Sequence, residues 1–414
     1  MDNRKIPVRS LLLIGSLYLT QYMGFSFFLE ALVAIMRKNG ASLQSISTIY
    51  LLGVFWLLKF LWAPVIDRFS PVKRWKYKGW LLLFQIAMAG VFISTAMFDV
   101  IDDLKLVVAM GMLMGFFSST QDVVADALVY RLLPISERSI GNAVKTAGTM
   151  LGWMLGSGVG LVVYTHVGWV SCLYILAGVM LISFIQILFF KEPEFTVVKQ
   201  DETGYWKYFV RFWGSERRSY WLVILIIFPM GYTSTHALMT PVLVDSGLRL
   251  DVIGLVVNVM GTIVGALSAF PSGYLLKRFG RKSVLMGLSS VHAVVALLLF
   301  LPLSVHNSPV LSALCVFMIM GAAGPAATVF YIIMMEYVSD EKPATDFAMQ
   351  HSIYLFISFF SGSVASAFAG KYGYGAVLIS VSVMSLISVI TLKGLYHPVV
   401  KKELHSAELV PTEQ

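Results

Sequence analysis

Charged residues are scarce in this chain of 414 residues. Asp, Glu, Lys and Arg make up 13% of it, against about 25% in a typical soluble protein. Hydrophobic residues make up 57%, and the mean hydropathy is +0.78. A soluble domain of this size would need far more charge to cover its surface. The composition therefore excludes an ordinary soluble protein and predicts a chain embedded in a lipid bilayer.

Cysteine is rare as well, and the usual signatures of enzyme sites are missing. Cys172 and Cys315 both lie in apolar runs, so the sequence predicts no disulfide framework. It has no phosphate-binding loop and no Cys/His cluster with zinc spacing. We therefore expect no cofactor, no metal and no enzymatic activity. The net charge of +8 is interpreted as loop charge that orients helices, with no nucleic acid as partner.

Long apolar runs dominate the sequence instead. Twelve of them reach the ~20 residues that a helix needs to cross the hydrocarbon core, and the spacing of the first six recurs about 210 residues later. We expect an all-α membrane protein with twelve transmembrane helices in two pseudo-symmetric six-helix bundles, an architecture suited to alternating access by a transporter. The predicted helices cover residues 10–35, 45–66, 79–98, 106–130, 142–165, 168–190, 220–244, 251–275, 283–303, 310–334, 345–370 and 374–395.

One long polar segment divides these helices into two sets. It predicts an N-terminal bundle over residues 1–190, a cytoplasmic interdomain loop over 191–219, a C-terminal bundle over 220–396 and a cytoplasmic tail over 397–414. Acidic, basic and aromatic residues are interleaved in the loop. That mixture favours an amphipathic helix at the membrane surface.

Lys and Arg are distributed unequally between the two sides of the membrane. If the N-terminus is cytoplasmic, 25 of the 31 Lys and Arg residues, Lys145 among them, belong to the cytoplasmic side and only 5 to the opposite side. Positive charge accumulates in cytoplasmic loops of membrane proteins. We therefore expect both termini to lie in the cytoplasm.

Charged residues inside the predicted helices are the first candidates for a functional site. Asp122 and Asp126 are four residues apart, so they share one face of their helix, next to Gln121. Lys59 lies at a similar depth, ~12–14 Å above the cytoplasmic interface at 1.5 Å per residue. An isolated ammonium group there costs at least ~2.5–3.5 kcal/mol, so Lys59 needs a partner, with Asp122 the first candidate and Asp126 the second. The pair either only pins two helices together or takes part in coupling to a proton or an anionic substrate.

Polar and aromatic side chains in three other predicted helices are candidates for lining a central cavity. They are Gln21, Tyr22 and Glu30 in the first helix, Tyr232 and His236 in the seventh, and Gln350 in the eleventh. The alternatives are an interfacial acid for Glu30 and a packing residue for His236. Four glycines of the fifth helix predict close helix packing: Gly152, Gly156, Gly158 and Gly160.

Each half carries a charged loop at the same place. The first copy contains Asp67 and Arg68, and the second contains Gly273, Arg278, Gly280 and Arg281. The second copy resembles the loop motif of the major facilitator superfamily, Gly-x-Leu-Ala-Asp-Arg-x-Gly-Arg-Lys. The copies depart from that motif at Ala63 and Ser70, where glycine is usual, and at Lys277, which replaces the acid. The resemblance implies charges that latch the two halves together on the cytoplasmic side.

A closer resemblance covers about 85 residues of the first half. The segments 59–64, 119–127 and 137–143 resemble signatures of the AmpG-type branch of this superfamily, with Gln121, Asp122 and Asp126 in the second of them. The branch includes muropeptide permeases, acetyl-CoA carriers and siderophore permeases of the pyochelin/rhizobactin type. The resemblance implies a transporter of a small molecule in the bacterial inner membrane. Because the sequence shows no ATP site, we expect protons to drive transport, and we expect a monomer.

The length of the chain favours one substrate over the others. Muropeptide permeases usually carry additional C-terminal helices, whereas the siderophore permeases are near this size. We therefore expect a proton-coupled importer of a ferric siderophore or a similar small chelate. The alternatives are a muropeptide permease, then a drug exporter. A non-transporting receptor is disfavoured because the chain keeps its intramembrane charges and has no large soluble domain.

Overall fold

The computed structural model describes residues 6–38, 51–72, 74–100, 102–193 and 204–396. Within these ranges, eight helical stretches are long and apolar enough to cross a bilayer. Two of the eight each hold two predicted spans, because neighbouring helices are joined there without an intervening loop. The all-α fold expected from the sequence is confirmed.

The helices form two groups. The first comprises α1 (Val8–Ser26), η1 (Phe27–Ala31), α2 (Leu32–Lys38), α4 (Gly53–Leu58), η3 (Lys59–Leu61), α5 (Ala63–Arg68), α6 (Lys78–Thr95), α7 (Leu104–Leu132), η4 (Ile135–Glu137), α8 (Arg138–Trp153), η5 (Met154–Val159) and α9 (Gly160–Phe189). After the short α10 (Tyr205–Trp213), the second comprises α11 (Glu216–Asp245), α12 (Leu250–Ile253), η6 (Gly254–Gly261), α13 (Thr262–Ser268), α14 (Ser272–Leu298), α15 (Phe300–Ser304), α16 (Pro309–Glu336) and α17 (Pro343–Leu395).

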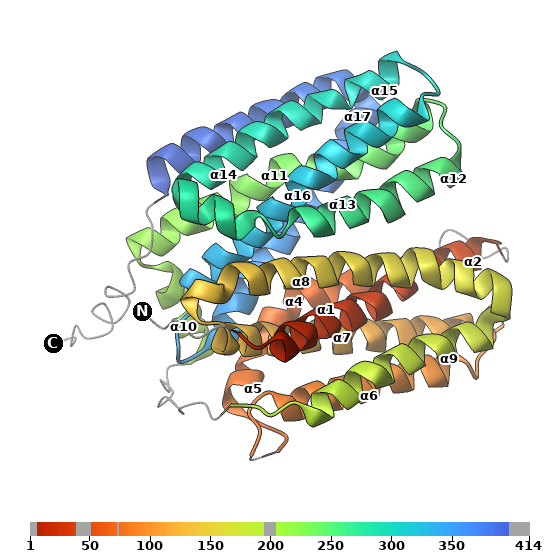
Figure 1. Ribbon diagram of the computed structural model, residues 1–414, viewed down its shortest axis with the longest axis vertical. Helices are drawn as coiled ribbons and strands as arrows, with labels where there is room; N and C mark the ends of the chain where they lie inside the picture. Colours follow the sequence, from red (N-terminus) through yellow and green to blue (C-terminus); the bar gives the residue numbers. More distant parts are fainter. Residues whose placement is uncertain (1–5, 39–50, 73, 101, 194–203, 397–414) are drawn as a thin grey trace, which may run out of the picture.

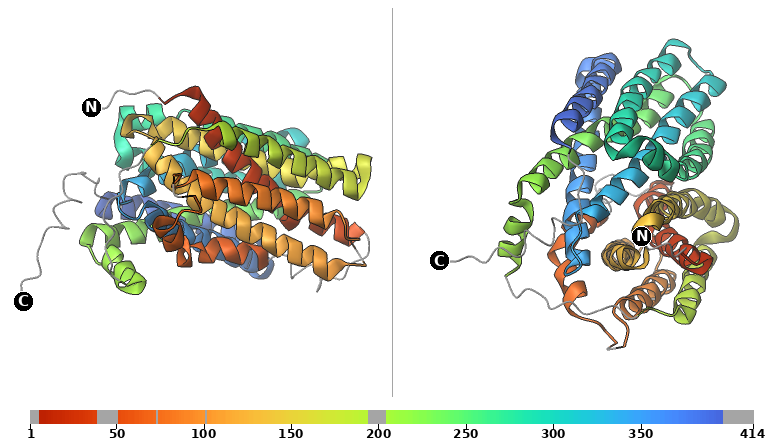
Figure 2. Two further views of the ribbon diagram at one scale, coloured as in Figure 1. Left: turned by 90° about the horizontal axis from the view of Figure 1, so that it is seen from below. Right: turned by 60° about the vertical axis from the view of Figure 1, so that its left-hand side comes forward.

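The two groups lie side by side with their helices running in broadly the same direction (Figure 1). Helix α8 faces α13 and α16 across the boundary, while α17 packs against α4, η3, α5 and α7. The first turn of α1 and the last turn of α17 lie at the same end of the molecule as α10 (Figure 2). Side chains from both groups can therefore meet along the boundary.

Three of the long helices bend at a glycine, and in α14 (Ser272–Leu298) it is Gly280, with φ +74°. Gly168 in α9 has φ +81° and Gly373 in α17 has φ +78°. Glycine adopts these positive φ values without the steric cost that a Cβ brings. Each bend falls at the junction of two predicted spans, so one helical stretch continues into the next while the chain turns back.

The predicted helix over residues 45–66 is only partly confirmed. Residues 45–50 lie outside the described residues. The remainder is broken into α4, the 3₁₀ turn η3 and α5. Pro64 lies in the first turn of α5. It has no backbone N–H to donate to a preceding carbonyl, and its ring disfavours helical backbone angles in the residue before it. The break places Lys59 in the 3₁₀ turn.

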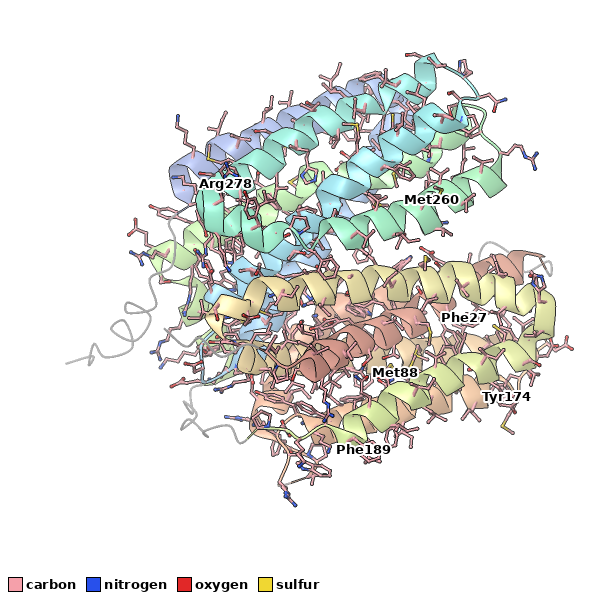
Figure 3. The ribbon with its side chains drawn as sticks, in the orientation of Figure 1. Phe27, Met88, Tyr174, Phe189, Met260 and Arg278 are labelled. Atoms are coloured by element: carbon pink, nitrogen blue, oxygen red, sulfur yellow. The ribbon has the colours of Figure 1, made fainter. Side chains whose placement is uncertain are left out.

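The outer surface is apolar, as expected of a membrane protein. On α9, Tyr174 is 51% exposed and Phe189 is 80% exposed, whereas Phe27 and Met88 are fully buried inside the first group (Figure 3). A soluble protein would not leave many large apolar side chains in water. These exposed side chains are suited to contact with lipid.

Helix α10 connects the two groups at one end. The Tyr208 hydroxyl donates a hydrogen bond to Asp346 in α17 at 2.7 Å, and the ring of Phe209 lies 6.2 Å from that of Phe60 in η3. The helix lies within the predicted loop 191–219, of which residues 194–203 are outside the described part.

Candidate functional site

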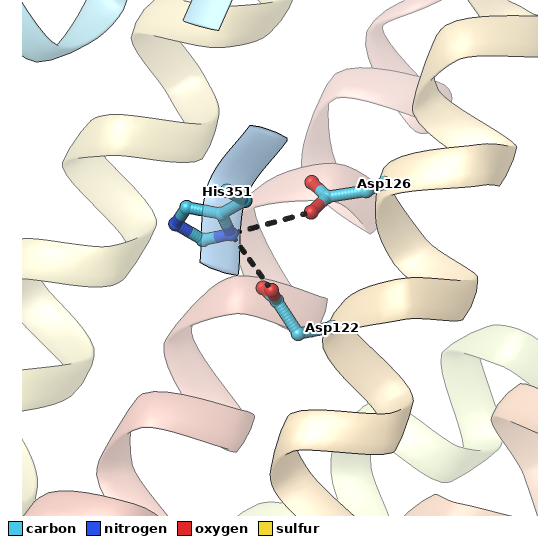
Figure 4. A group of neighbouring side chains, drawn as sticks. All are labelled: Asp122, Asp126 and His351. Atoms are coloured by element: carbon cyan, nitrogen blue, oxygen red, sulfur yellow. Dashed lines mark ion pairs between the residues drawn. The ribbon is translucent and has the colours of Figure 1, made fainter. Parts of the chain in front are cut away.

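A cluster of buried charges lies at the boundary between the two groups. Lys59 comes from η3, Asp122 and Asp126 from α7, Lys145 from α8, and His351 from α17. Each side chain is at most 1% exposed. Figure 4 shows one ring nitrogen of His351, from the second group, facing both carboxylates of the first. Burial of so many ionisable groups is costly unless they pair with one another.

Lys59 forms a buried ion pair with Asp122, the first of the two partners predicted from depth in the membrane. The other oxygen of Asp122 accepts a hydrogen bond at 2.7 Å from the side-chain amide of Gln21, in α1. The pair thus ties the 3₁₀ turn η3 to α7 and α1. Gln21 was predicted as a cavity residue, and its amide instead supports the charge cluster.

A second ion pair, between Lys145 and Asp126, was not predicted. The charge distribution of the sequence places Lys145 on the cytoplasmic side, whereas α8 begins at Arg138 and Lys145 is buried two turns inside it. Its ammonium group lies 4.3 Å from the ring centroid of Tyr331. The Tyr18 hydroxyl donates to Asp126 at 2.5 Å.

His351 joins the two pairs across the boundary. Its Nδ1 lies 2.7 Å from the ammonium nitrogen of Lys59, and 3.4 Å and 3.9 Å from oxygens of Asp122 and Asp126. An ammonium group only donates hydrogen bonds, so Nδ1 accepts and the ring proton sits on Nε2. Counted with a neutral ring, two ionised lysines and two ionised aspartates, the formal charges of the cluster cancel.

The cluster is suited to a proton better than to a metal ion. Asp122, Asp126 and His351 have the ligand atoms and spacing that a metal site needs. However, the ammonium groups of Lys59 and Lys145 already occupy both carboxylates and would repel a cation. A proton needs less room. In the described part of the chain, Asp126 Oδ2 has no hydrogen-bond partner, so it can accept a proton without breaking a hydrogen bond.

The remaining predicted site residues of the first group lie outside this cluster. The Gln121 amide donates to the Leu17 carbonyl at 3.4 Å, which ties α7 to α1. Tyr22 is buried against Trp56, with ring centroids 4.8 Å apart. Glu30 accepts from the Trp153 indole at 3.0 Å and is exposed. These three residues hold helices together.

In the second group, the predicted cavity residues separate into two places. The Gln350 amide oxygen accepts from the Trp221 indole at 2.7 Å, so this side chain packs inside the group. Tyr232 and His236 line a pocket between α11 and α17. His351 belongs to α17, one of the two helices that form this pocket.

The two charged loops have different roles in the structure. Asp67 accepts hydrogen bonds from the backbone N–H groups of Ala344 and Thr345, at 3.1 and 2.8 Å, and from the Thr345 hydroxyl at 2.6 Å. These donors belong to the first turn of α17, where free N–H groups and the helix dipole favour an acid. The first loop therefore latches the two groups together.

The second loop makes its ion pair within its own group. Arg281 pairs with Glu336 at 2.5 Å, and Arg278 lies against the ring of Tyr274. Gly280 has φ +74°, which explains the glycine at that position. Gly273 of this loop lies against the other group, because a Cβ there would be 2.4 Å from the Ser139 hydroxyl oxygen. Arg68 of the first loop is exposed.

Burial raises the pKa of the Asp67 carboxyl from 3.8 to about 6, and its hydrogen bonds to Thr345 oppose that rise. Asp67 lies just beyond the predicted span 45–66, at the end of the molecule where the groups are latched. Its protonation is therefore expected to depend on whether the latch is closed.

Comparisons with known proteins identify relatives of this chain. A profile of the Major Facilitator Superfamily matches residues 11–345 and 243–411. The anhydromuropeptide permease of Escherichia coli K12 is 27% identical over 356 residues, which are 83% of this chain and 71% of that protein. A putative transporter, AmpG 3, of Rickettsia prowazekii is 23% identical over 420 residues, 96% of this chain and 98% of that protein.

A solved structure supports the same fold. The human organic anion transporter MFSD10 (TETRAN) matches with a TM-score of 0.75 over 93% of this chain and 99% of that structure. The two sequences are 13% identical, so the likeness extends to the fold alone.

Proposed function

Because the chain belongs to the major facilitator superfamily, we propose that it is a proton-coupled importer of anhydromuropeptide-type cell-wall fragments in the inner membrane of a bacterium. That it is a multi-pass membrane transporter follows from the family and from its permease relatives. The substrate, the proton and the direction are our proposal. The orientation with both termini in the cytoplasm is part of it.

The names of the relatives favour muropeptides over siderophores. They are an anhydromuropeptide permease and a putative AmpG transporter, and neither name refers to iron. Length was our argument for the siderophore. Length no longer separates a siderophore permease from a muropeptide permease, because the AmpG 3 protein matches this chain over 98% of its own length and is therefore of similar size.

Proton coupling rests on the charge cluster. It is fully buried, its formal charges cancel, and Oδ2 of Asp126 has no hydrogen-bond partner among the described residues. It also joins the two groups of helices through His351. A proton that binds there changes the charge balance at the boundary that alternating access must open and close.

Uptake into proteoliposomes tests this proposal. With the outside acidic, wild-type protein should accumulate labelled anhydromuropeptide above its equilibrium level, and an uncoupler should abolish the accumulation. Asp126→Asn should lose accumulation while still exchanging labelled for unlabelled solute. A labelled ferric siderophore serves as the second substrate. Accumulation of the chelate but not of the muropeptide would overturn the proposal and restore the siderophore reading.

A further inference from the structure

The pocket between α11 and α17 has a chemistry of its own. Its volume is about 520 Å³, within the ~300–1,000 Å³ usual for small-molecule sites. The polar lining comprises Tyr232, Thr233 and His236 of α11 and Ser358, Ser363 and Ser366 of α17. No Lys, Arg, Asp or Glu is among the described residues that line it. It therefore offers hydrogen bonds to an uncharged ligand.

Most of its hydroxyl groups present an acceptor to the pocket. Ser358 donates to the Tyr354 carbonyl at 2.7 Å, and Ser366 donates to the Gly362 carbonyl at 3.0 Å. With their hydrogens engaged, the oxygens of both hydroxyls remain as acceptors. Within the described residues, His236 and Ser363 have no hydrogen-bond partner of their own. The pocket thus fits a ligand rich in O–H and N–H donors.

One wall of the pocket is linked to the charge cluster by three side chains. The hydroxyls of Tyr232 and Tyr354 lie 3.3 Å apart. The ring of Tyr354 stacks on His351 with centroids 5.9 Å apart and an interplanar angle of 28°. His351 in turn contacts Lys59. A ligand that moves Tyr232 would therefore disturb the histidine that joins the two groups.

We propose that this pocket binds the saccharide part of the solute, and that Tyr354 is the positioning residue that transmits its occupancy to His351. This inference rests on the proposed function. The hydroxyl and N-acetyl amide groups of a sugar can donate hydrogen bonds to the serine oxygens. The rings of Tyr232 and Phe359 offer apolar faces against which a sugar ring can pack. A ferric chelate would instead bring anionic oxygen acceptors to a pocket with no cation among its described lining residues.

Cysteine protection tests the pocket without requiring transport. The two native cysteines, Cys172 and Cys315, are buried, so a thiol introduced by Ser363→Cys should be the main site of maleimide labelling. An anhydro-disaccharide without peptide should slow that labelling, and the stem peptide alone should not. Ser304→Cys is the control, because Ser304 is exposed at the end of α15, just beyond the predicted span 283–303, and is not part of the pocket.

The outcomes separate this inference from the proposed function. Equal labelling with and without the disaccharide, or protection by the peptide alone, would overturn the pocket assignment even if muropeptide uptake is observed. Protection by the disaccharide without any uptake would support the pocket and overturn the transport proposal. Ser366→Ala should weaken disaccharide protection about tenfold, the size expected for one good hydrogen bond. Ser304→Ala should leave it unchanged.

A second measurement tests the positioning role. Tyr354→Phe keeps the ring but removes the hydroxyl contact with Tyr232. It should retain disaccharide protection and solute exchange, while gradient-driven accumulation falls about tenfold and its pH profile shifts. Wild-type accumulation in Tyr354→Phe would overturn the link, and so would an equal loss of exchange and accumulation, which points to a merely structural residue.

Discussion

At the scale of single residues, the buried charges act in pairs. Removing one member of the Lys59–Asp122 pair leaves the other charge buried without its partner, which typically costs about 3–5 kcal/mol. Replacing both by uncharged side chains of similar shape removes the desolvation cost of each. The stability of this site is therefore a property of the pair.

We predict that Lys59→Met and Asp122→Asn each lower the melting temperature, and that the double variant recovers most of the loss. Thermal unfolding of the four proteins in one detergent gives the coupling between the two changes. The Lys145→Met and Asp126→Asn cycle should behave in the same way. Additive losses in either cycle would mean that the pair contributes no coupling.

At the scale of elements, one helix–helix contact depends on backbone approach. In η5, a Cβ added at Gly156 would lie 2.1 Å from the Met23 carbonyl oxygen of α1, whereas one at Gly158 would meet nothing within 4 Å. Of the four glycines predicted to serve close packing, Gly152, Gly156 and Gly160 contact the first helix and Gly158 does not.

Gly156→Ala should therefore push α1 away from η5 and destabilise the protein by about 1–3 kcal/mol. Gly158→Ala is the control from the same turn and should be neutral or slightly stabilising, since alanine is the better helix former. The measurement is the melting temperature of both variants. Similar losses in the two would contradict the contact with Met23.

The latch between α5 and α17 should respond to pH. The pKa of Asp67 is raised to about 6 in the closed latch and should return towards about 3.9 when the carboxyl meets water. The closed state then binds protons more readily. Protonation of Asp67 therefore stabilises the closed latch relative to the open one. This stabilisation is complete below about pH 4 and is lost as the pH rises through about 6.

The distance between fluorescent labels on α5 and α17 measures that equilibrium. We expect the population with a short distance to fall between about pH 4 and about pH 6, and Asp67→Asn to remove the dependence. A wild-type latch that instead closes as the pH rises would mean that the hydrogen bonds from Thr345 outweigh burial.

At the scale of the whole molecule, the orientation in the membrane remains a prediction. With Lys145 placed in the core, 24 Lys and Arg residues instead of 25 belong to the predicted cytoplasmic side, against 5 on the other. The excess is hardly changed. Fluorescent protein fused to the C-terminus should therefore fluoresce in intact cells, and alkaline phosphatase fused there should be inactive. The reverse pattern would mean that the C-terminus lies on the opposite side of the membrane.

The sequence was informative about elements and less so about contacts. Apolar run length predicted where helices form, because it reflects the thickness of the bilayer. It also placed Lys59 and Asp122 at one depth. It did not reveal Lys145, because a lysine near a helix end is usually a loop charge. His351 lies over 200 residues from Asp122, and which helix faces bring such residues together depends on packing across the boundary.

The electrical neutrality of the buried cluster has a consequence for energetics. One added proton gives the site a charge of +1. Moving one elementary charge across a membrane potential of 100 mV changes its free energy by about 2.3 kcal/mol. Carrying an uncharged solute, the protonated protein would be driven inward by a negative interior as well as by the pH difference. Carrying a singly charged anion, it would be indifferent to voltage. Current measured during uptake therefore reports the charge of the natural solute.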